Sequence, residues 1–80
     1  MTIRFSRHAK SRMRLYGVEK GDVELAIDRP DAAEKEGART SVLKAFPGRF
    51  SEYPLKVVYE IRPEELLIVT VYPLKKRLWR

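Results

Sequence analysis

The chain has 80 residues, of which 17 are Lys or Arg and 11 are Asp or Glu, so its net charge is +6 at neutral pH. With 44% apolar and 35% charged residues, the composition is typical of a soluble folded domain and not of a disordered tail. No cysteine is present, which excludes a disulfide framework, a thiolate zinc site and a cysteine nucleophile. Because a chain this short builds one core, we expect a single domain over residues 1–80.

The apolar stretches of the sequence are too short to cross a bilayer. The longest runs from Leu66 to Tyr72, whereas a membrane-spanning helix needs about 20 apolar residues. The N-terminus lacks the uninterrupted apolar run of a signal peptide. We therefore expect a cytoplasmic protein with no membrane partner.

The charges are unevenly distributed along the chain. Residues 1–14 hold five basic residues and no acid, residues 19–36 hold seven acids, and the C-terminal residues are basic again. A cluster of like charge raises the rate at which a polyanion encounters the surface, so the pattern favours RNA as a ligand. A solvated surface with surplus Lys and Arg would give the same pattern.

Two residues delimit the first predicted helix, over residues 7–16. Ser6 is a good N-cap, and Gly17 stands where a left-handed residue ends a helix. At 100° per residue one stripe of this helix is apolar, and we expect it to pack on the rest of the protein. The stripe consists of Phe5, Ala9, Met13 and Tyr16, and the residues on the far side, in water, are Arg7, Lys10 and Arg14.

The next segments predict a second helix and then a sheet. A helix is expected from about Glu19 to Asp28, with Val23, Ala26 and Ile27 facing inward. Three strands are expected over residues 40–46, 55–62 and 66–72, and residues 32–36 and 2–5 are candidates for a further strand and an edge strand. The sequence thus predicts an α+β fold with two N-terminal helices packed on one face of an antiparallel sheet of three to four strands.

The first predicted helix carries the candidate catalytic residues His8 and Arg12. An imidazole can exchange a proton near neutral pH, and a guanidinium one turn later can grip a phosphate. Together they would form half of a phosphodiester-cleaving site, provided that they face a groove open to solvent. The alternative is that His8 caps or packs locally and Arg12 pairs with Asp22 or Glu24.

Tyr72, at the end of the last predicted strand, is the third candidate catalytic residue. By alternation it shares a face with Leu66, Ile68 and Thr70, opposite Leu67, Val69 and Val71. It could stack on a base or donate a proton, or simply pack its ring. The candidate nucleic-acid contacts are Arg7, Lys44, Lys56, Lys75 and Lys76.

Metal ions and cofactors are not expected. One histidine, no cysteine and scattered acids do not form a ligand set. The chain has no Gly-rich phosphate loop, nucleophile elbow or dinucleotide fingerprint.

The first predicted helix starts with the motif His-Ala-x-x-Arg-Met, formed by His8, Ala9, Arg12 and Met13. The strand patterns of residues 55–59 and 68–72 follow later in the chain. In these features the chain resembles the small prokaryotic proteins grouped as domain of unknown function 4258. That family is similar to toxins of the RelE, ParE and BrnT type, in which helices pack on an antiparallel sheet whose other face holds messenger RNA or a partner protein. The resemblance implies a RelE-like fold and an endoribonuclease, free or acting on ribosome-bound messenger RNA, that an acidic antitoxin silences.

Three functions follow from these observations. The first is a metal-independent endoribonuclease toxin, with His8 as general acid or base, Arg12 on the scissile phosphate and Tyr72 orienting the substrate. The second is a non-catalytic nucleic-acid-binding protein. The third is an interaction module that docks an acidic protein on a strand edge or a basic face.

Overall fold

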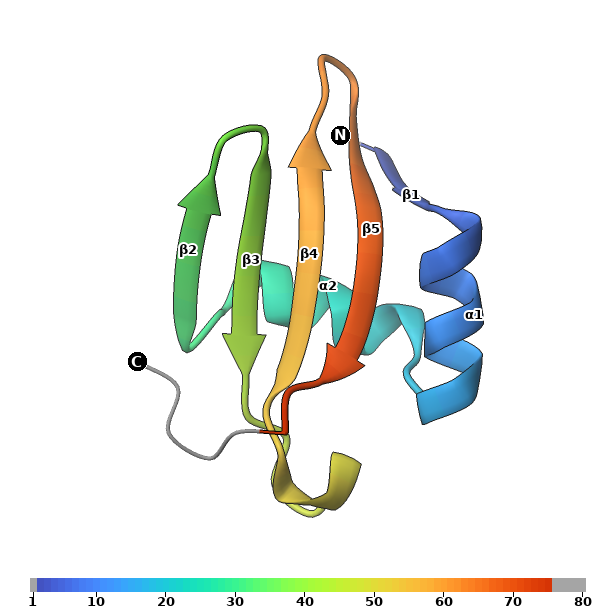
Figure 1. The fold of residues 1–80 in the computed structure, drawn as a ribbon, viewed down its shortest axis with the longest axis vertical. Coiled ribbons are helices and arrows are strands. Elements are labelled where there is room, and N and C mark those ends of the chain that lie inside the picture. Colours follow the sequence, from blue (N-terminus) through green and yellow to red (C-terminus); the bar gives the residue numbers. More distant parts are fainter. Residues whose placement is uncertain (1, 76–80) are drawn as a thin grey trace.

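The structure, a computed structural model, describes residues 2–75. In this part of the chain two helices follow the first strand and precede the other four strands (Figure 1). The elements are β1 (Thr2–Phe5), α1 (Arg7–Tyr16), α2 (Lys20–Asp28), β2 (Ala32–Glu36), β3 (Arg39–Lys44), β4 (Leu55–Ile61) and β5 (Glu65–Pro73), with one short helical turn, η1 (Phe50–Glu52), between β3 and β4. The predicted α+β class is confirmed, and both candidate strands are present.

The strands form one mixed sheet in the order β1-β5-β4-β3-β2. Three neighbouring pairs are antiparallel, but β1 pairs with β5 in parallel, with Phe5 opposite Ile68. The prediction of an antiparallel sheet of three to four strands was therefore wrong. The reason is that β1 leads directly into a helix, so no hairpin turn sets its partner, and β1 joins the sheet edge that β5 offers.

The helices and the sheet share one hydrophobic core. Figure 1 shows α2 crossing behind β3 and β4, whereas α1 runs beside β5. Within residues 2–75, neither helix has the length and apolar character that a membrane crossing requires. The buried core residues are Ala9, Met13, Val18, Val23, Ala26, Val42, Leu55, Val57, Ile68 and Val71.

Both predicted ends of α1 are confirmed. The Ser6 hydroxyl oxygen accepts a hydrogen bond from the Ala9 N–H at 3.0 Å, and Gly17 closes the helix in the left-handed region at φ 68°. The same hydroxyl donates to the Val69 carbonyl oxygen at 2.9 Å. Ser6 therefore caps α1 and also ties the start of the helix to the middle of β5.

A β-bulge at Val69 changes which residues of β5 face the core. Val58 of β4 pairs with Thr70, but the next residue of β4 pairs with Ile68, so Val69 is the extra residue of the bulge. After the bulge the alternation is shifted by one position, and Tyr72 stands opposite Lys56, on the face away from the core. The prediction that Tyr72 shares a face with Ile68 was wrong for this reason.

Arg49 holds a strained turn against α2. Its guanidinium donates to the two carboxylate oxygens of Asp22 at 2.7 and 2.8 Å. It also lies over the ring of Phe50, 4.7 Å from the centroid. Phe50 and the next two residues all have positive φ, between 54° and 65°, which costs about 1–2 kcal/mol per residue. The contacts of Arg49 offset part of that cost.

Ser6→Ala should lower the free energy of unfolding by about 1–2 kcal/mol, because it removes the cap of α1 together with the bond to the bulge. Urea unfolding followed by circular dichroism measures the change. The matched control is Ser11→Ala, an exposed position within the same helix, which should change stability by less than about 0.5 kcal/mol. Equal effects at the two positions would contradict the role of Ser6.

The Asp22–Arg49 pair should make stability depend on pH. The hydrogen bonds from Arg49 hold the pKa of Asp22 below its usual value. The pair's stabilisation is therefore fully present above the unfolded-state pKa of about 3.9 and is lost as the pH falls through the lower folded-state pKa.

Asp22→Asn removes the charge but keeps an oxygen that can accept the Glu19 N–H. We expect the variant to be less stable than the parent at pH 7 and the difference to shrink toward about pH 2–3, measured by urea unfolding at each pH. Glu24→Gln, an exposed position of α2, controls for the loss of one acid. A stability difference that stays constant over this range would refute the prediction.

Candidate nucleic-acid interface

One face of the sheet is covered by the core, and within residues 2–75 no helix covers the other face (Figure 1). In β4 the buried Leu55 and Val57 alternate with the half-buried Lys56 and Val58, which point to the opposite side. Their cross-strand partners lie on that side too. We call this surface the open face and define it by Ser41, Leu43, Lys56, Val58, Thr70 and Tyr72.

Two acids of this side of the sheet, Glu60 and Glu65, lie beyond the open face, toward the β4–β5 turn, and are paired with arginines, whereas Glu34 of β2 stands opposite Ser41. Glu60 accepts from Arg62 at 2.8 Å and from Arg39 at 3.1 Å, and these bonds hold the pKa of Glu60 below its usual value. Glu65 is paired with Arg4 at 3.0 Å. None of the six residues that define the open face is acidic, and the direct cross-strand partners of Lys56 are Leu43 and Tyr72, neither of which carries a carboxylate.

Lys56 and Tyr72 stand opposite each other on β4 and β5. The Lys56 ammonium lies 5.9 Å from the centroid of the Tyr72 ring. Within residues 2–75 Lys56 has no acidic partner. A phosphate and a base could thus be bound at adjacent points, the phosphate by the ammonium and the base by the ring.

Arg12 stands at the level of Tyr72 along the sheet. Ser6 is hydrogen-bonded to Val69, and from there α1 and β5 run in the same direction (Figure 1). Six helical residues from Ser6 to Arg12 advance the chain by about 9 Å, and three strand residues from Val69 to Tyr72 advance it by about 10 Å. The two side chains therefore arise at matching heights on neighbouring elements.

His8 and Arg12 lie on the side of α1 that faces away from α2. Lys10 and Met13 border a pocket together with Lys20 of α2. At 100° per residue, His8 and Arg12 are on the other flank of the buried stripe, toward the open face. His8 is exposed and Arg12 half-buried.

The structure does not show the capping and ion-pair contacts that would give His8 and Arg12 a purely structural role. Among residues 2–75 the side chains of His8 and Arg12 make no hydrogen bond or ion pair, and the cap of α1 is Ser6. The alternative in which Arg12 pairs with Asp22 or Glu24 does not hold within residues 2–75, since Arg49 occupies both oxygens of Asp22 and Glu24 has no ion pair there. Within the described residues, the guanidinium of Arg12 therefore has no acidic partner.

The predicted nucleic-acid contacts do not form one surface. Lys56 is on the open face, but Lys44 pairs with the buried Leu55 and so lies on the covered side. Arg7 is exposed in the first turn of α1, and Lys75 is exposed just after β5. Lys76 lies outside the described residues.

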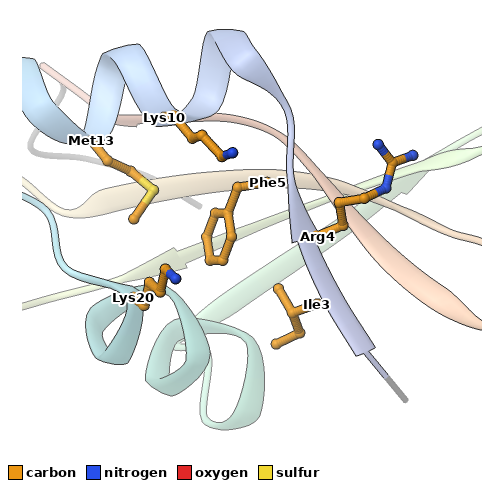
Figure 2. Close-up of a pocket in the computed structure, with 6 residues that line it drawn as sticks. All are labelled: Ile3, Arg4, Phe5, Lys10, Met13 and Lys20. Atoms are coloured by element: carbon orange, nitrogen blue, oxygen red, sulfur yellow. The ribbon is translucent and has the colours of Figure 1, made fainter.

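A pocket on the covered side of the sheet was missed by sequence reasoning. Its volume is about 510 Å³, and Lys10, predicted to be in water, borders it (Figure 2). The pocket depends on the pairing of β1 with β5, which no local pattern reveals. The lining residues are Ile3, Arg4, Phe5, Lys10, Met13 and Lys20.

Metal-ligating side chains do not gather in the described part of the chain. Within residues 2–75, no group of three or more His, Asp or Glu side chains could hold a metal ion. Carboxylates there serve as partners of arginines, as at Asp22, Glu60 and Glu65.

A family model matches most of the chain, although no individual curated protein or solved structure does. One family model, described as Domain of unknown function (DUF4258), matches residues 5–73, which span every helix and four of the five strands. The chain therefore belongs to the DUF4258 family.

Proposed function

We propose that the protein binds RNA on its open face and cleaves it without a metal ion, as the toxin of a toxin–antitoxin pair. The observation that carries the proposal is that Lys56 and Tyr72 lie together on the open face, while Arg12 is on the flank of α1 away from the pocket, and that neither cation has an acidic partner within residues 2–75. An unpaired cation gains more from a phosphate than one already neutralised by a carboxylate. The uneven charge of the chain would bring the polyanion to this surface.

Cleavage would use the ribose itself as the nucleophile. Neutral His8 accepts the proton of the 2′-hydroxyl, and the 2′-oxygen attacks the adjacent phosphorus. The bond from phosphorus to the 5′-oxygen breaks, and that oxygen leaves with a proton from water. The products are a 2′,3′-cyclic phosphate and a 5′-hydroxyl. Arg12 stabilises the charge that develops on the phosphate oxygens, and Tyr72 orients a neighbouring base.

The finer classification of the fold is part of the same proposal. The support for a RelE-like fold is the resemblance in the His-Ala-x-x-Arg-Met segment, combined with helices that precede the antiparallel strands and one sheet face left open. By the same resemblance, an acidic antitoxin would be the physiological partner, and messenger RNA, free or on the ribosome, the substrate.

RNA cleavage by the purified chain tests the proposal. In EDTA, the protein should cut a mixed-sequence RNA or the messenger RNA of translating ribosomes, and leave 2′,3′-cyclic phosphate ends. His8→Ala and Arg12→Ala should each lower the rate by about 100-fold, the scale of a lost general base or of a lost charge stabiliser. Arg14→Ala removes the same charge as Arg12→Ala from the far flank of α1 and should leave the rate nearly unchanged.

If the protein leaves both substrates uncut, it is the non-catalytic alternative, which the solvent-exposed position of His8 favours. In that case RNA binding should still weaken steeply with salt, because each phosphate contact releases counterions. Tyr72→Ala should then weaken binding by about tenfold, and His8→Ala should barely change it. Binding that is insensitive to both salt and Tyr72→Ala would rule out the open face as an RNA site.

A further inference from the structure

The pocket between β1, α1 and α2 combines an apolar floor with a cationic rim. Ile3 and Phe5 of β1 and Met13 of α1 form the floor. Figure 2 shows the amino groups of Lys10 and Lys20 on either side of the Phe5 ring, and Lys20 lies 5.9 Å from the ring centroid. An apolar group bound on this floor would therefore be flanked by two ammonium ions.

The rim charges of the pocket are not neutralised by the protein. Among residues 2–75 neither Lys10 nor Lys20 has an acidic partner. No acidic residue lines the pocket, and the guanidinium of Arg4, which points away from the ring in Figure 2, is already paired with Glu65. The pocket thus complements a ligand with apolar character at its centre and negative charge on both sides.

The same pocket adjoins a strand edge that is free within residues 2–75. The strand order puts β1 at the end of the sheet, with β5 as its one partner there. Ile3 and Phe5 pair with Leu66 and Ile68 and so point to the covered side. A strand added to this edge would point every second side chain to the same side, toward the pocket.

We propose that this pocket docks an acidic segment of a partner protein, which adds to the free edge of β1 in extended form. One apolar side chain of the segment enters the pocket, and acidic side chains two positions before and after it meet Lys10 and Lys20. Backbone hydrogen bonds to β1 supply affinity, and the pocket supplies the choice of sequence. The inference does not depend on RNA cleavage, since the pocket opens on the covered side of the sheet and not on the open face.

A free nucleotide fits the pocket less well. The rim offers ammonium groups for a phosphate, but the other lining side chains, Ile3, Phe5 and Met13, have no group that could read the edge of a base. An apolar side chain needs no such partners.

A short synthetic peptide tests the docking directly. It carries one leucine with a glutamate two positions before and two positions after it, and serine or threonine elsewhere, and its binding is measured by fluorescence anisotropy. Lys10→Glu and Lys20→Glu should each weaken binding by about tenfold or more. Lys35→Glu makes the same charge change at an exposed position of β2, at the other end of the sheet, and should have little effect. A peptide with lysine in place of both glutamates should prefer the Lys20→Glu variant.

Backbone amide shifts of isotopically labelled protein should locate the peptide at β1 and the pocket residues and leave β2 unchanged. Several outcomes would overturn the inference. One is a peptide with glycine in place of leucine that binds equally well, and another is a Lys35→Glu variant that loses as much affinity as Lys20→Glu. Adenosine monophosphate or anionic lipid vesicles that displace the peptide from the same residues would assign the pocket to a different ligand. Circular dichroism of each variant confirms that it is folded.

Discussion

The hydroxyl of Ser6 links the start of α1 to the bulge of β5, and the placement of the candidate site depends on this link. It accepts from the Ala9 N–H and donates to the Val69 carbonyl oxygen at the bulge of β5. A single side chain thus sets where α1 begins, and at what height along β5 it lies. The bulge in turn decides that Ile68 and Val71 enter the core while Tyr72 faces the open side. Without both features, Arg12 and Tyr72 would not stand at matching heights.

Local chemistry predicted the elements of this fold because their signals are local. Ser6 and Gly17 mark the ends of α1 by cap geometry, and the spacing of Ala9, Met13 and Tyr16 marks its buried face. Strands β3, β4 and β5 follow from runs rich in Val, Ile, Leu, Thr and Tyr that are separated by prolines. A search for these signals needs no knowledge of the partner elements.

What the sequence could not reveal depends on pairings between distant segments. The bulge at Val69 leaves no mark in the residue types of β5, yet it reverses the facing of Tyr72. The parallel pairing of β1 with β5 joins residues more than 60 positions apart, and no turn motif in the sequence indicates it. The pocket at Phe5 depends on that pairing and was missed with it. The side-chain chemistry and helical spacing of His8 and Arg12 did identify them as the residues to examine, but not their unpaired state within residues 2–75.

Helix α1 lies between the two proposed binding surfaces and contributes to both. Its Lys10 flank borders the pocket, and its Arg12 flank turns toward the open face. An α-helix with its side chains is about 10 Å across, which is close to the Debye screening length at physiological salt. An acidic segment bound at Lys10 would therefore lower the positive potential at Arg12, and RNA bound at Arg12 would lower it at Lys10. Because linkage is reciprocal, each ligand would weaken the other by the same factor. A partner bound on the covered side could in this way reduce RNA binding on the open face without touching it.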